Sequence, residues 1–80
     1  MEAFLGQIQL LPYNFAPQRW ALCEGQLLKI SQNTALYSLI GTAYGGDGTK
    51  TFALPNLKGK GPCADLNYYI ALEGAFPARG

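Results

Sequence analysis

Apolar and polar residues alternate with a period of two in several short segments, which predicts a chain built mainly from strands. In residues 4–11, FLGQIQLL, Ile8 and Leu10 alternate with Gln7 and Gln9. This alternation is typical of a strand with one buried face. Four more short apolar segments are predicted to be strands: residues 20–23, 27–30, 51–54 and 66–72.

One segment, residues 32–40, has the period of a helix instead. Its apolar residues would form a single stripe, made of Ala35, Leu36, Leu39 and Ile40. Ser31 is the expected N-cap, and Gly41 suits the residue of positive φ that often follows a helix. So short a helix must pack on the strands to be stable. The predicted fold class is therefore α+β and β-dominated, in a single domain over residues 1–80.

The sequence Glu24-Gly25-Gln26 predicts a tight hairpin between the strands at 20–23 and 27–30. The hairpin would bring Trp20 and Leu22 onto one buried face with Leu28 and Ile30, and Trp20 would face the helix stripe. The predicted core residues are Trp20, Leu22, Leu36, Leu39, Ile40 and Phe52.

The composition predicts that the chain associates with other subunits. Apolar residues make up 49% of the 80 residues and charged residues only 14%, where soluble domains usually have about a quarter charged. Such a chain has too little polar surface to cover itself, so part of its apolar surface is expected to meet another subunit. Segment 66–72, LNYYIAL, is apolar on both faces and needs cover on both, and segment 4–11 has an edge to cover. We therefore predict intersubunit contacts at the two chain ends, through Phe4, Ile8, Tyr68, Tyr69 and Phe76.

Charge and hydropathy argue against two other classes of partner. The formal net charge is +1 and the basic residues are scattered, which is too little to neutralise a run of phosphates, so no nucleic-acid partner is expected. No apolar run approaches the length of a membrane span. The beginning Met1-Glu2-Ala3-Phe4 lacks the basic region of a signal peptide, so the ordinary secretory route is not expected either.

The residue types of a catalytic or metal site are scarce. There is no histidine, and the five carboxylates are spread singly along the chain, so we expect no enzyme, cofactor or metal site. The run Gly45-Gly46-Asp47-Gly48 resembles a phosphate-binding loop only superficially. Its glycines follow the helix rather than open one, so a turn is predicted there.

Two cysteines, Cys23 and Cys63, leave two interpretations open. They behave as small buried hydrophobic residues, or they form a disulfide within the chain or between subunits.

Several blocks of the sequence, in order, resemble the phage tail collar domain of short tail fibres and of small bacterial proteins related to them. These blocks are the opening strand 4–8, the segment 14–26, the helix with its glycine turn 31–48, the strand and loop 52–60, and the closing segment 66–79. In longer members a large variable segment separates the loop from the closing strand. Here Pro62-Cys63-Ala64-Asp65 spans the same gap.

The resemblance implies a location in the virion tail or at the extracellular cell surface, and two non-enzymatic functions. The first is a structural subunit that associates with itself. A trimer is the arrangement expected first, and an open fibre is the next. The alternative is an adhesion module that binds a receptor such as a cell-surface glycan or another tail protein. The missing variable segment favours the structural function, because receptor specificity is expected in such added segments.

Overall fold

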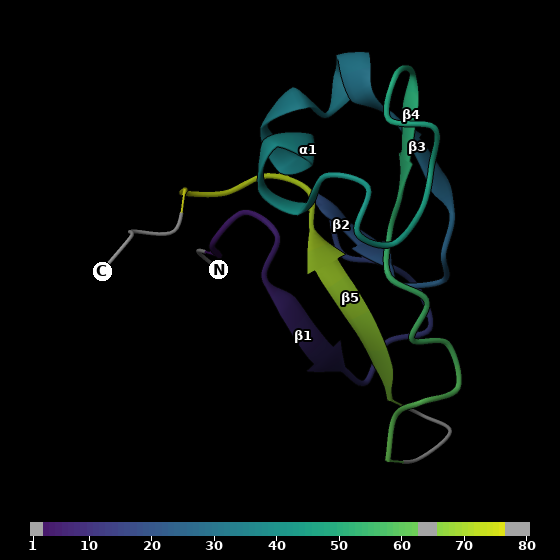
Figure 1. Cartoon of the computed structure of the whole chain (residues 1–80). Helices are drawn as coiled ribbons and strands as arrows, with labels where there is room; N and C mark the ends of the chain where they lie inside the picture. The colour runs from purple at the N-terminus through teal and green to yellow at the C-terminus, as the bar shows by residue number, and fades with distance from the viewer. Residues whose placement is uncertain (1–2, 63–65, 77–80) are drawn as a thin grey trace.

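The computed structural model describes residues 3–62 and 66–76, which form two small antiparallel sheets and one short helix (Figure 1). The fold is a β-dominated α+β domain, as the sequence predicted. In chain order the elements are β1 (Ile8–Leu11), β2 (Trp20–Leu22), β3 (Leu27–Lys29), the 3₁₀ turn η1 (Ile30–Gln32), α1 (Thr34–Ile40), β4 (Thr51–Ala53) and β5 (Asn67–Ala71).

The larger sheet has the strand order β1-β5-β2, so the last strand in sequence is the central one. Its register pairs Gln9 with Tyr69 on one side and Leu22 with Tyr69 on the other. The prediction that this strand needs cover from another subunit is wrong. The single chain buries both faces: Tyr69 belongs to one apolar cluster and Ile70 to another.

The predicted hairpin at residues 24–26 is also wrong, because β2 and β3 belong to different sheets. The side chain of Gln26 holds this bend: its Nε2 donates to the Leu22 carbonyl at 2.8 Å, and its Oε1 accepts the Glu24 N–H at 3.2 Å. The bend carries the chain from β2 to β3, which pairs with β4 from Leu27 opposite Ala53 to Lys29 opposite Thr51.

Helix α1 begins later than predicted. Ser31 lies in the 3₁₀ turn, and Asn33 takes the N-cap position without a side-chain capping bond to the helix. The Asn33 amide donates instead to the Lys29 carbonyl at 3.0 Å, which stabilises the preceding turn. Gly41 follows the helix with φ 54° and ψ −142°; the positive φ agrees with the prediction, although the ψ lies outside the left-handed helical region.

The core divides into two clusters on opposite faces of the three-stranded sheet. The larger cluster combines Leu36 of α1 with Phe52 of β4, Leu54 directly after β4 and Ile70 of β5. The smaller consists of Leu11, Trp20, Tyr69 and Ala71. Trp20 is therefore buried, but it faces away from the helix stripe, and the predicted face shared with Leu28 and Ile30 does not exist. Register explains the difference, because Trp20 pairs with Ala71 and so lies on the Tyr69 face of the sheet.

Candidate functional site

The two ends of the described chain are held together by backbone hydrogen bonds beside the three-stranded sheet. The Leu5 N–H donates to the Ala75 carbonyl at 2.8 Å, and the Ala75 N–H donates to the Ala3 carbonyl at 3.1 Å. Phe4 and Ala75 thus form a parallel bridge outside the regular strands, and the strand predicted from residue 4 begins only at Ile8. Gly74 makes this approach possible, since a Cβ there would lie 2.3 Å from the Ala3 carbonyl oxygen.

A tight turn leads into β2 on the same side of the molecule. The Trp20 N–H donates to the Pro17 carbonyl at 3.0 Å, so Pro17-Gln18-Arg19-Trp20 closes a four-residue turn. Arg19, its third residue, has φ 71° and is the one non-glycine residue of positive φ among residues 3–62 and 66–76. A type II turn places glycine or asparagine at this position. The fold therefore holds Arg19 in a backbone conformation that its residue type disfavours.

The conformation is fixed by partners on either side of Arg19. Its carbonyl accepts the Leu72 N–H at 2.8 Å, directly after β5. Its guanidinium Nε lies 3.5 Å from Glu73 Oε2, in an ion pair whose side chains are both mostly exposed. An exposed pair of this kind stabilises a fold very little.

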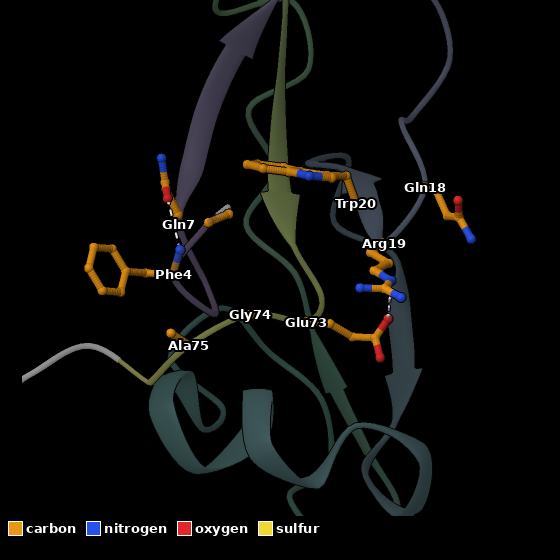
Figure 2. A pocket seen from close by; sticks show the side chains of 9 residues that line it. Phe4, Gln7, Gln18, Arg19, Trp20, Glu73, Gly74 and Ala75 are labelled. Atoms are coloured by element: carbon orange, nitrogen blue, oxygen red, sulfur yellow. Dashed lines mark hydrogen bonds and ion pairs between the residues drawn. The ribbon is translucent and has the colours of Figure 1, made fainter. Parts of the chain in front are cut away.

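A hollow of about 690 Å³ opens between the chain ends and this turn. Its lining residues are Ala3, Phe4, Gln7, Gln18, Arg19, Trp20, Glu73, Gly74 and Ala75. Figure 2 shows the Trp20 indole edge-on across β5, with the Arg19–Glu73 pair on one side of the hollow and Gln7 on the other. The Phe4 ring points outward from it. A second hollow, of about 340 Å³, lies on the α1 side of the same ion pair.

Gln7 is held in place by a local bond. Its Oε1 accepts the Phe4 N–H at 3.0 Å, drawn as a dashed line in Figure 2. Its backbone carbonyl accepts the Ala71 N–H at 2.9 Å. The hollow is thus bordered by a buried indole, an oriented amide and one paired cation and anion.

The glycine-rich loop before β4 is held by bonds from its own backbone. Asp47 Oδ1 accepts the N–H groups of Thr49, Lys50 and Thr51 at 2.8, 2.8 and 3.0 Å. These bonds, with that of Thr51 the strongest influence, lower the pKa of Asp47 from its ordinary 3.8 to about 2. Gly46, with φ 96°, packs so closely that a Cβ would lie 2.4 Å from Phe52 Cα. The loop is a turn, as predicted, because its acidic side chain accepts from its own backbone.

Two aromatic rings form an exposed pair in the segment between β1 and β2. Tyr13 and Phe15 stack with their centroids 5.7 Å apart and an interplanar angle of 19°. The Tyr13 carbonyl accepts from Tyr69 Oη at 2.6 Å and from Asn67 Nδ2 at 3.1 Å, which ties the segment to β5. The rings themselves face solvent, since Tyr13 is 44% and Phe15 66% exposed.

The residues predicted to form a subunit interface are placed in two different environments. Phe4, Ile8 and Phe76 are exposed, at 55%, 39% and 57%. Tyr69 is 1% exposed within the single chain, so it offers no surface to another subunit. Tyr68 packs on the larger cluster and is only partly exposed. The two tyrosines do face opposite sides of the strand, as the alternation of a strand requires.

The residues predicted to form the core lie inside or against it. Trp20, Leu36 and Phe52 are buried, while Leu22, Leu39 and Ile40 are partly buried and pack on the two clusters. Cys23 is buried, and burial raises the pKa of its thiol to about 11. Cys63 lies outside the described residues, so the pairing of the two cysteines stays a prediction.

Sequence reasoning missed the hollow and the roles of Gln7, Arg19 and Glu73. Arg19 lies far before Glu73 in sequence and is brought to it by the pairing of β2 with β5. A usable signal was the proline at the start of Pro17-Gln18-Arg19-Trp20, because proline is a frequent turn residue. Nothing in the residue types indicates the positive φ that makes Arg19 unusual.

Two other kinds of site have no candidate in the part of the chain that the structure describes. No three side chains among histidine, cysteine, aspartate and glutamate come close enough there to hold a metal ion. Within residues 3–62 and 66–76, no helix has the length and apolar character needed to cross a bilayer.

Comparison with known families decides the relationship of the chain. The model of the phage tail collar domain matches residues 6–62, which is well over half of the sequence. The chain belongs to the phage tail collar domain family. No curated protein matches it.

The matched residues of this collar domain run from just before β1 to the loop after β4. Strand β5 follows the match, although it is the central strand that joins β1 to β2. The collar family is structural and generally non-catalytic, and membership suggests a module of the tail-fibre type located in the virion tail.

Proposed function

We propose that this collar domain is a structural subunit of a tail fibre, or of a related extracellular fibre, that associates with further copies of itself. The observation that carries the proposal is the exposed apolar group Phe4, Ile8 and Phe76 beside the edge strand β1. We call this region the chain-end edge.

The edge strand has few of the features that usually prevent pairing with another chain. β1 reads Ile8-Gln9-Leu10-Leu11, with no charged residue and no proline inside it. Natural edge strands are commonly protected by lysine, proline or a bulge. An uncharged edge with exposed apolar side chains at its start is suited to pairing with a second copy.

The structure also changes which segment is expected to take part. β5 is central and covered within the chain, so exchange of the closing strand between copies is not required. The proposal therefore rests on β1 and on the bridged residues at the two ends, Phe4 and Ala75. The first proposed arrangement remains a trimer, and the second an open fibre.

Sedimentation velocity over a range of micromolar concentrations tests the proposal. The wild-type chain should sediment as an oligomer, and Ile8→Lys should shift it toward monomer because a lysine desolvated at a paired edge is costly. The matched control is Leu27→Lys, which changes an exposed leucine on β3 in the other sheet. A monomeric wild type, or dissociation by Leu27→Lys and not by Ile8→Lys, would show that the chain-end edge is not the interface.

A second candidate is an adhesion module that binds a cell-surface glycan. The stacked and exposed Tyr13–Phe15 pair favours it, because such rings can pack against the apolar face of a sugar. Loss of binding to a glycan array in Phe15→Ser, with an unchanged thermal melt, would support this function.

A further inference from the structure

We propose that the hollow between the chain ends and the Arg19 turn binds a neutral saccharide unit, a mono- or disaccharide, against Trp20. The proposal deepens the second candidate function and rests on it, but it assigns a different site from the Tyr13–Phe15 pair. Phe4 and Ala75 border this hollow and also belong to the proposed subunit contact, so the two proposals share these residues.

The size and lining of the hollow fit a small ligand. Its volume of about 690 Å³ lies inside the range of small-molecule sites, which runs from about 300 to 1,000 Å³. Such sites are lined mainly by apolar and aromatic side chains, with a few precisely placed polar groups. Here the aromatic part is the small exposed portion of the Trp20 indole, which is 9% exposed, and the polar groups come from Gln7, Arg19 and Glu73.

The charges of the lining favour a ligand without net charge. Arg19 and Glu73 are the charged residues that border the hollow, and they are already paired at 3.5 Å. Their charges cancel, so neither an anion nor a cation gains a net attraction. The guanidinium still offers N–H donors and the carboxylate still offers acceptor lone pairs. A neutral sugar carries neighbouring hydroxyl groups, each of which both donates and accepts hydrogen bonds. Such hydroxyl groups can bind a protein donor and a protein acceptor that lie side by side.

The backbone at Arg19 gives independent support. Residues held in disfavoured backbone conformations occur often at ligand sites, where the surrounding structure fixes them. Glycine would fit φ 71° without cost, yet the position holds a long side chain on the rim of the hollow. The ion pair with Glu73 is too exposed to explain this by stability. A contact between the guanidinium and a ligand would explain it.

Trp20 is the single tryptophan of the chain, so its fluorescence reports on one position, where the indole borders both the smaller core cluster and the hollow. We would titrate the wild-type protein with glucose, galactose, mannose and N-acetylglucosamine to roughly tens of millimolar, the weak end of specific binding. At least one sugar should shift the Trp20 emission with a saturable curve. Acetate and methylammonium, as charged probes, should not.

Variants of the rim separate this site from others. Arg19→Gly keeps the positive φ and removes the guanidinium, and Glu73→Gln removes the negative charge at nearly constant shape; each should weaken sugar binding at least tenfold. The matched controls Lys58→Ala and Glu24→Gln, at exposed positions outside the lining, should bind as the wild type does.

Three outcomes would overturn the proposal. They are no saturable change with any of the sugars, a change retained in both rim variants, and stronger binding of either charged probe than of every sugar. Glycan-array binding that persists without any Trp20 response, and that is lost in Phe15→Ser, would refute this site while leaving the adhesion function in place.

Discussion

Two chain reversals of the molecule, the glycine loop at residues 45–51 and the turn at residues 17–20, differ in the residue type that takes positive φ. Both reverse the chain next to a strand and both need positive φ. In the loop, glycine occupies the demanding positions and Asp47 accepts three backbone N–H groups. In the turn, the demanding position holds Arg19.

We infer from this difference that the loop belongs to the scaffold of the molecule and the turn to the proposed binding surface. Where residue type and backbone agree, as in the loop, the sequence serves the stability of the fold. Where they conflict, as at Arg19, the surrounding structure holds a side chain in a conformation of local cost. The conflict lies on the chain-end side of the molecule, beside the hollow of Figure 2 and near the exposed Phe4.

Gly46→Ala should destabilise the domain more than any substitution at Gly59, Asp47 or Arg19. The new Cβ would meet the backbone of Phe52 at a φ that alanine disfavours. Strain of about 1–3 kcal/mol and overpacking of a further 1–3 kcal/mol would add, which approaches the whole stability of a small domain. The measurement is chemical denaturation followed by circular dichroism.

Gly59→Ala is the matched control for this change, because Gly59 has a similar φ of 76° but open space around its Cβ position. It should cost only the strain, about 1–2 kcal/mol. Equal losses of stability in the two variants would contradict the close packing of Gly46 on β4.

Asp47→Asn should remove a pH dependence rather than unfold the domain. The folded-state pKa of Asp47 is depressed to about 2, so its contribution to stability is present above the unfolded value near 4. That contribution is lost as the pH falls through 4 toward 2. Thermal melts of the wild type and of Asp47→Asn should therefore differ at pH 6 and converge near pH 2. A constant difference across this range would show that the charge of Asp47 does not stabilise the loop.

Arg19→Gly should have the smallest effect on stability, and in the opposite direction. Relief of the strain at positive φ raises the free energy of unfolding by about 1–2 kcal/mol. The greater freedom of glycine in the unfolded chain lowers it by about 0.5–1 kcal/mol. The net expectation is a melting temperature equal to or slightly above that of the wild type. A clear loss of stability would mean that Arg19 is held for structural reasons, and the contrast between the two turns would disappear.

Much of the scaffold was predictable from local pattern, and the site was not. The strand at residues 4–11, the helix at residues 32–40 and the glycine turn were predicted from neighbours in sequence, and each element exists. The strand begins only at Ile8 and the helix only at Thr34. The pairing partners of β2 and β3 depend on register across the fold, so a plausible hairpin at Gly25 was wrong. The hollow joins residues 3–7, 18–20 and 73–75, which only the central position of β5 brings together.

Amide hydrogen exchange at several protein concentrations tests the central proposal most directly. In that proposal the chain-end edge contacts further copies, whereas the glycine loop is stabilised only by contacts within its own chain. As concentration rises from nanomolar to micromolar, the outward amides of β1, residues 8–11, should become more protected, because they pair with another copy. Protection of residues 49–51 should stay constant, since those N–H groups are already bound to Asp47 within the chain. Protection of β1 that is independent of concentration, or a concentration-dependent gain confined to the glycine loop, would contradict the account.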